Sequence, residues 1–130
     1  MGIQLQLTLA VAVGGALGTL TRTVLILVLP GALEFPFPTL IVNIVGSFAL
    51  GAVLAWHQRK VLNPFWLNGL GAGFCGSLTT FSAVSAELMQ FWQQGALGMF
   101  GLYLAALLLP GLGAVMLAFR LFAPAPRSYS

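Results

Sequence analysis

The feature that most constrains this chain is a succession of long apolar stretches that contain almost no charged residues. They lie at about 5–29, 39–56, 65–91 and 96–122, and each is near the roughly 20 residues that an α-helix needs to cross a bilayer. With five Lys+Arg and two Asp+Glu among 130 residues, the chain cannot solvate the surface of a water-soluble domain. We therefore predict an all-α membrane protein, with four transmembrane helices in one membrane domain and a mobile tail at 123–130.

The distribution of basic residues predicts which side of the membrane the termini occupy. Four spans put both termini on one side, and four basic residues fall on that side: Arg59, Lys60, Arg120 and Arg127. The loops in the 30s and the 90s contain no Lys or Arg. Because basic loops stay in the cytoplasm, we predict cytoplasmic termini in the inner (plasma) membrane.

Few residues of this chain suit enzyme chemistry. One His, one Cys and two acidic residues are too few for most acid–base or metal-dependent hydrolases, and they provide no Cys/His cluster for zinc. The net charge of +3 is too small and too scattered to indicate a nucleic-acid partner. We therefore predict that the protein is not an enzyme and binds no nucleic acid.

The third apolar stretch contains an unusual run, GFCGSLTTFSAVS, from Gly73 to Ser85. Four glycines within 69–76 weaken its helical propensity, and we expect a break near Gly76–Thr79. Non-helical backbone at membrane depth persists only where protein, water or an ion satisfies it. The freed carbonyls and the negative end of a half-helix would suit a hard cation such as Na+, and an ordinary kinked helix explains the run equally well.

Neutral polar side chains recur within the apolar stretches. Thr39, Asn43 and Ser47 are four residues apart, so they form one polar stripe on a helix. Any one such residue is explained by hydrogen bonding between helices, but their density around 77–85 favours a conduction path. Amide and hydroxyl groups and the edges of Phe rings present partial positive charge, which suits a small anion that must also leave.

Three segments, GGALGTLTR, PTLIVNIVGSFALG and GFCGSLTTFS, together resemble the Fluc (CrcB) family of fluoride channels. The resemblance covers Gly14 to about Phe122. It implies four-span subunits that pair antiparallel as a dual-topology dimer, carry two fluoride pores and export fluoride passively from the cytoplasm. It also implies a structural Na+ at the dimer interface, held by the backbone carbonyls of Gly76 and Thr79 from each subunit.

The resemblance further assigns roles to side chains of this sequence. Arg22 matches an arginine near the pore entrance. Phe81 matches the first of two phenylalanines in the path, and Val84 stands where the family has the second, so it offers no ring edge. The anion pathway that the resemblance implies consists of Asn43, Thr80, Phe81, Ser82, Val84, Ser85 and Tyr103.

Val84 and the one-sided distribution of Lys and Arg leave two assemblies open. One is a homodimer that tolerates Val84. The other is a heterodimer in which this chain has a fixed orientation and pairs with a homologous subunit of opposite orientation. In the second case the chain is a partner subunit whose own pore conducts poorly or not at all.

A different class of protein also uses four spans and an antiparallel dimer, namely the small proton-coupled multidrug exporters. Those transporters need a carboxylate in the first span, and residues 5–29 contain none. Glu87 is badly placed to replace it. A functional role for this intramembrane charge and simple interfacial placement at the end of the third span both remain open. The sequence therefore favours passive conduction over proton-driven antiport.

Overall fold

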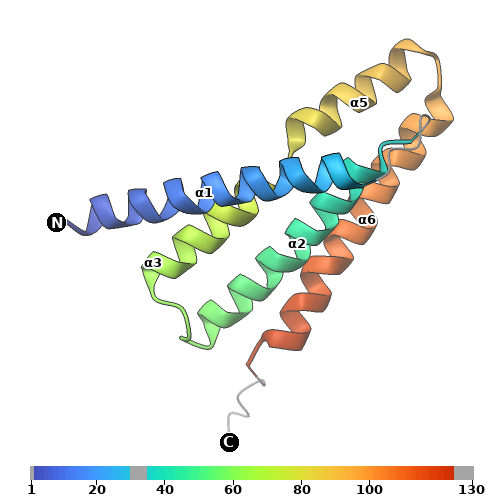
Figure 1. Cartoon of the computed structure of the whole chain (residues 1–130). Coiled ribbons are helices and arrows are strands. Elements are labelled where there is room, and N and C mark those ends of the chain that lie inside the picture. Colours follow the sequence, from blue (N-terminus) through green and yellow to red (C-terminus); the bar gives the residue numbers. More distant parts are fainter. Residues whose placement is uncertain (1, 30–34, 125–130) are drawn as a thin grey trace, which may run out of the picture.

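The computed structural model describes residues 2–29 and 35–124, which form helices joined by short turns (Figure 1). The loop residues 30–34 and the end of the predicted mobile tail, including Arg127, lie outside this description. No strand interrupts the helices of the described ranges, and the predicted all-helical fold class is confirmed. In chain order the elements are α1 (Ile3–Val28), α2 (Phe37–Gln58), α3 (Pro64–Leu67), η1 (Asn68–Cys75), α4 (Gly76–Leu78), α5 (Phe81–Gln93) and α6 (Leu97–Phe122).

Three helices of the described residues, α1, α2 and α6, are long and apolar enough to cross a membrane. The third expected span is divided instead into α3, η1, α4 and α5, and the predicted break in it is confirmed. The break lies at Thr79 and Thr80, which are extended with ψ of 155° and 121°. Gly76 is itself helical, with φ of −64° and ψ of −29°, so the break begins at the far end of the predicted interval.

The glycine-rich segment before the break forms a π-helix, η1, rather than a gap in the helix. A π-turn pairs each N–H with the carbonyl five residues back, and such turns are frequent at functional sites. The Gly76 amide still donates to the carbonyl of Gly71 in this register. The low helical propensity of glycine therefore widens the helix over Asn68–Cys75, and the chain leaves the helix only where two threonines follow.

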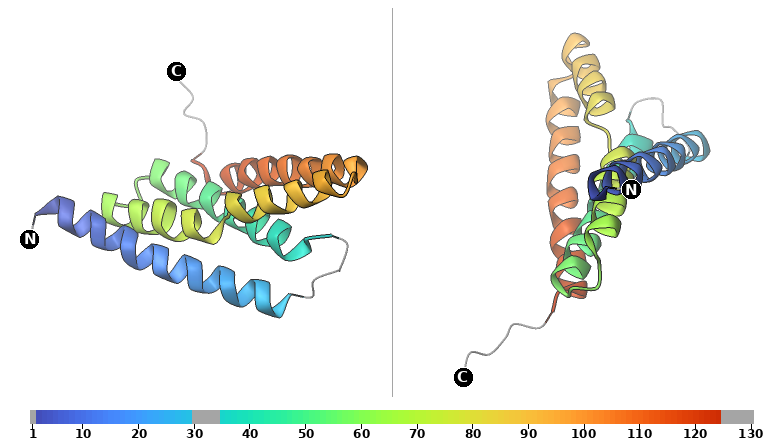
Figure 2. Two further views of the ribbon diagram at one scale, coloured as in Figure 1. Left: turned by 90° about the horizontal axis from the view of Figure 1, so that it is seen from above. Right: turned by 90° about the vertical axis from the view of Figure 1, so that its left-hand side faces the viewer.

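The helices pack through three main contacts. α1 lies along η1 and α4, α2 lies along α6, and α5 returns against α6 (Figures 1 and 2). The start of α1, the turn between α2 and α3, and the end of α6 lie at one end of the molecule. The end of α1, the start of α2, and the turn between α5 and α6 lie at the other end.

Glycines allow the backbones of α1 and η1 to touch. A Cβ atom at Gly14 would overlap the carbonyl oxygen of Gly69, and one at Gly18 would overlap that of Phe74. These two residues are four apart, the spacing that brings membrane helices together without intervening side chains. Gly46 of α2 similarly leaves room only for the methyl group of Thr79, so it brings α2 against the break.

A second cluster of buried residues lies between α5 and α6. Val84, Phe91 and Tyr103 form its centre, and the Tyr103 side chain has no solvent exposure. The Tyr103 ring meets Phe35 edge to face at 5.5 Å between centroids and Phe91 at 6.0 Å, an arrangement that aromatic pairs prefer. This cluster orients α5 so that one side of it faces α6 and the start of α2.

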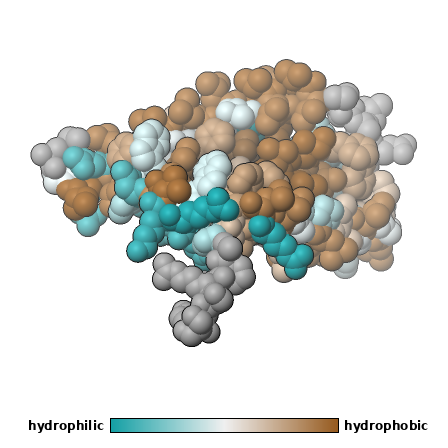
Figure 3. Space-filling view, turned by 90° about the horizontal axis from the view of Figure 1, so that it is seen from below, coloured by the Kyte–Doolittle hydropathy of each residue, from teal (hydrophilic) through white to brown (hydrophobic). Residues whose placement is uncertain are grey.

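Most of the outer surface is apolar, as expected of a chain that lies in lipid. Large apolar side chains stand exposed along α1 and α6, among them Leu27 and Leu109. Figure 3 shows the hydrophilic side chains gathered in one part of a mostly hydrophobic face. The residues at the end of α2, 57–60, are polar and exposed, so this end of the helix suits the membrane–water boundary.

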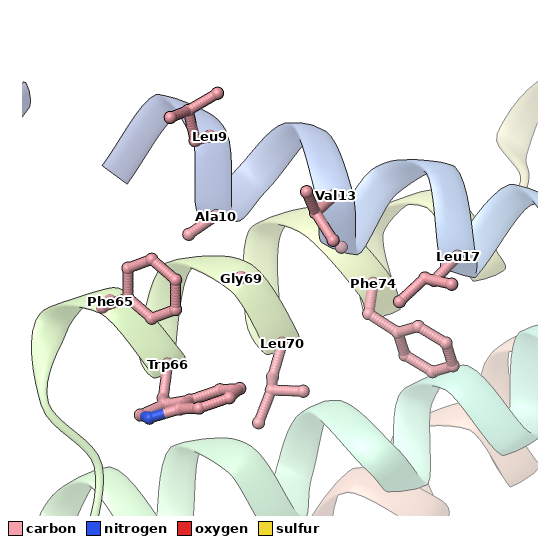
Figure 4. Close-up of a pocket in the computed structure, with 10 residues that line it drawn as sticks. Leu9, Ala10, Val13, Leu17, Phe65, Trp66, Gly69, Leu70 and Phe74 are labelled. Carbon is pink, nitrogen blue, oxygen red and sulfur yellow. The ribbon is translucent and has the colours of Figure 1, made fainter. Parts of the chain in front are cut away.

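A shallow apolar groove runs beside the contact of α1 with α3 and η1 (Figure 4). Its volume is about 280 Å³, and apolar side chains such as Leu9, Val13, Trp66 and Phe74 surround it. Gly14 and Gly69 also line it, at the point where the backbones of the two helices touch. The groove therefore continues the lipid-facing surface rather than adding a polar site.

We predict that Gly14→Val prevents stable packing of α1 on η1. The new side chain meets the Gly69 backbone, which cannot move aside as a flexible side chain would, so the loss should be about 3 kcal/mol or more. The melting temperature of the detergent-solubilised protein measures this effect. Gly98→Ala is the matched control, because open space surrounds Gly98 and its melting temperature should not fall. Equal melting temperatures for both variants would contradict the packing described here.

Candidate ion pathway at the helix break

The backbone at the break is held by Asn43 of α2. The Thr80 amide donates to Asn43 Oδ1 at 3.0 Å, and Asn43 Nδ2 donates to the carbonyl of Thr39 at 2.8 Å. A helix that continued through Thr80 would give its amide to the Gly76 carbonyl instead. Asn43 therefore replaces a helical hydrogen bond, and it does so for an amide that the bilayer cannot satisfy.

The Thr80 hydroxyl starts the helix that follows. Its oxygen accepts from the Ala83 amide at 3.2 Å, which is the capping bond of a helix N-terminus, and α5 begins at Phe81. The same oxygen lies 3.1 Å from Ser82 Oγ. Hydroxyl groups thus gather at the positive end of the α5 dipole, where negative charge is favoured.

The other side of the break presents carbonyl oxygens. The Thr79 carbonyl accepts from Arg22 Nη1 at 3.3 Å, and the Thr79 amide donates to the carbonyl of Cys75 at 3.1 Å. Gly76 and Thr79 border an open hollow of about 620 Å³, which Asn43, Ser47 and Asn68 also line. Polar groups in a hollow on a surface that is otherwise apolar mark a place where an ion or a second protein chain would be expected.

Arg22, which the resemblance assigns to the pore entrance, extends from α1 to the helix break. Its side chain is half-buried, and its guanidinium reaches from α1 to the Thr79 carbonyl. An arginine within an apolar helix needs such a partner, because its charge cannot be shed in the membrane. The bond therefore ties α1 to the C-terminal end of α4.

Glu87 and Thr39 lie outside the predicted anion pathway, but their hydrogen bonds connect its members. Glu87 of α5 is half-buried, its Oε1 accepts from Thr39 Oγ1 at 2.6 Å, and its Oε2 accepts from Tyr103 Oη at 2.5 Å. Simple interfacial placement therefore does not describe Glu87, because the packing of α5 on α6 turns its carboxylate inward. The acidic residue inside an apolar stretch was visible in the sequence as a signal, but its two partners were not.

The structure brings some of the predicted pathway residues together and separates others. Asn43, Thr80 and Ser82 form one hydrogen-bonded group, and Tyr103 joins it through Glu87 and Thr39. The other predicted residues differ in exposure. On α5, Phe81 is 81% exposed and Ser85 is exposed, with its hydroxyl donating to the Phe81 carbonyl at 2.9 Å. Val84 of α5 is 1% exposed, and Tyr103 of α6 is fully buried. Within this chain, Val84 lies in the core between α5 and α6 rather than on an open face.

These observations define a class of protein, a multi-pass helical membrane protein with a broken helix and polar side chains gathered at the break. Residues 9–119 match the family described as CrcB-like protein, Camphor Resistance (CrcB), and the chain belongs to this family.

Several relatives are similar over most of their length. A protein of Gloeobacter violaceus is 46% identical over 111 residues, which is 80% of this chain and 86% of the relative. A protein of Saccharophagus degradans is 40% identical over 88% of this chain and 87% of its own length, and one of Escherichia coli is 40% identical over 91% and 94%. All three relatives carry the name fluoride-specific ion channel FluC.

We predict that Asn43→Ala destabilises the break. The buried Thr80 amide would lose its acceptor, and leaving such a group unpaired costs about 1–3 kcal/mol. Thermal unfolding of the purified protein measures the loss. Gln90→Ala is the control, since Gln90 is an exposed residue of α5, and it should leave the melting temperature unchanged. An Asn43→Ala protein as stable as the control would show that the break does not depend on Asn43.

Proposed function

We propose that this chain is the subunit of a fluoride-selective passive ion channel that exports fluoride from the cytoplasm and so confers fluoride resistance. The observation that carries the proposal is the helix break, where Asn43 Oδ1 accepts from the Thr80 amide and the Thr80 and Ser82 hydroxyls lie at the positive end of α5. The names of the relatives support fluoride as the ion.

The chemistry of these groups suits a small anion in transit. Amide and hydroxyl groups are neutral donors, and the exposed Phe81 ring adds an edge of partial positive charge. Each neutral donor binds an anion weakly, so the ion can leave again, as conduction requires. Arg22 supplies a full positive charge, but its bond to the Thr79 carbonyl holds it on the other side of the break.

A single chain leaves the site open to lipid, and we propose that a second subunit closes it. The hollow beside Asn43 and Thr79 contains amide, hydroxyl and carbonyl groups that a bilayer cannot satisfy, and the ring of Phe81, in the turn that follows, is exposed. The partner is a second copy or a homologous subunit in antiparallel orientation. We propose the inner (plasma) membrane as the location, and cytoplasmic termini if this chain has one orientation.

We also propose a structural Na+ between the subunits, held by the carbonyls of Gly76 and Thr79. The Gly76 carbonyl fits, because the Thr80 amide that would pair with it in a helix donates to Asn43 instead. The Thr79 carbonyl has two lone pairs and gives one to Arg22, so one remains for an ion. Oxygen ligands are those that hard cations prefer, and the bound ion would supply positive charge at the interface.

The proposal is tested by fluoride efflux from liposomes that contain the purified chain, followed with a fluoride electrode. We expect rapid fluoride efflux with little chloride flux, and no dependence on a proton gradient. Selective efflux by this chain alone would establish a homodimer. Chloride efflux equal to that of fluoride, or efflux driven by protons, would overturn the proposal.

If the chain alone is silent, co-expression with a homologous subunit of opposite charge bias distinguishes the heterodimer from the absence of a channel. Fluoride efflux that requires both subunits would support the heterodimer. No efflux from the folded pair would overturn the proposed function.

Phe81→Leu tests the role of the ring in the conducting assembly. Leucine keeps the apolar volume but removes the ring edge, and a loss of up to about tenfold in fluoride flux is expected, since such a contact contributes about 1 kcal/mol. Phe65→Leu is the matched control, because Phe65 is also exposed but lies on α3, away from the break. Equal flux in both variants would remove Phe81 from the pathway.

Replacement of Na+ by N-methylglucamine at constant ionic strength tests the cation site. We expect a lower melting temperature and a smaller dimer fraction in gel filtration, because the carbonyls of two subunits would face one another without a cation. Restoring Na+ should reverse both changes. The proposed site is wrong if the melting temperature and the dimer fraction are the same in every cation.

A further inference from the structure

Glu87 is the one acidic residue of the described part of the chain, and the fluoride pathway as proposed gives it no task. Its carboxylate lies at the meeting point of three helices, α5, α2 and α6. Both oxygens are engaged in short hydrogen bonds, to Thr39 at 2.6 Å and to Tyr103 at 2.5 Å. Both partners are buried, so water does not replace these bonds.

The number of protons at this cluster is limited. An ionised carboxylate only accepts hydrogen bonds, and the hydroxyls of threonine and tyrosine have one proton each. Both hydroxyl protons therefore point at Glu87. The Tyr103 oxygen then presents lone pairs to any other neighbour, and it cannot donate to an anion.

We propose that Glu87 is a positioning residue that holds the hydroxyl protons of Thr39 and Tyr103, and that it thereby weakens fluoride binding along the pathway. This inference rests on the proposed function and deepens it. Fluoride and the carboxylate compete for the same two donors, since both are anions that accept hydrogen bonds. Such competition keeps the ion loosely bound, which favours rapid conduction.

The cluster is connected to the helix break. Thr39 donates its hydroxyl to Glu87, and its carbonyl accepts from Asn43, which in turn accepts from the Thr80 amide. Hydrogen bonds therefore run without interruption from Tyr103 to the start of α5. The orientation of these hydroxyls belongs to the same network that fixes the helix break.

Glu87→Gln tests the inference, because glutamine has nearly the same shape without the charge. Its NH2 group donates, so the hydroxyl opposite must accept and turns its own proton outward. We expect the fluoride concentration for half-maximal flux to fall about tenfold, the effect of one added hydrogen bond. We expect maximal flux to fall as well, because the ion leaves more slowly. A residue that served packing alone would lower flux without raising affinity.

A background that lacks both hydroxyls, Thr39→Val with Tyr103→Phe, separates hydroxyl capture from simple charge repulsion. In that background Glu87→Gln should no longer increase fluoride affinity. A gain that persists would show that removal of the negative charge is sufficient, and it would overturn the inference.

Fluoride binding to the purified protein in detergent, measured by fluorine NMR of added sodium fluoride, gives the same comparison without conduction. If the wild-type protein binds fluoride and Glu87→Gln binds it no more tightly, the inference alone is wrong. If no form of the protein, alone or with its partner subunit, binds fluoride, the proposed function fails and the inference fails with it. Tighter binding in Glu87→Gln that depends on the two hydroxyls supports the inference.

Discussion

The structure depends on the hydrogen bond between the Thr80 amide and Asn43. A bilayer offers no water to backbone groups, so a helix can be interrupted there only if another part of the protein completes its hydrogen bonding. Asn43 does this from a neighbouring helix, with a side chain that is fixed in turn by the Thr39 carbonyl. The direction of α5, the exposure of the carbonyls before the break and the gathering of hydroxyls after it all follow from this bond.

The sequence predicted the helices well because hydropathy is a property of segments. Apolar stretches near the length of a bilayer leave few alternatives to helices, and glycines followed by threonines indicated where a helix would be weak. The π-helical register of Asn68–Cys75 could not be predicted in this way. Low helical propensity indicates that an ordinary α-helix is unfavourable there, but it does not predict which other hydrogen-bonding register forms instead.

The candidate site was predicted less completely, because its residues act in pairs. The four-residue spacing of Thr39 and Asn43 showed that they share a helix face. The rotation of α5 about its axis decides that Glu87 and Val84 point toward α6, and this rotation comes from packing around Tyr103. Spacing within one segment contains no information on such contacts between segments.

The close contact of α1 with η1 has a mechanical consequence. Where backbone lies on backbone, as at Gly14 and Gly69, no side chain is present that could change its rotamer, so these helices can only move as one piece. α5 is joined to the rest of the chain by two extended residues and by hydrogen bonds of side chains. Any widening that lets an ion pass therefore falls to α5, while α1 with η1 and α6 with α2 serve as its fixed frame.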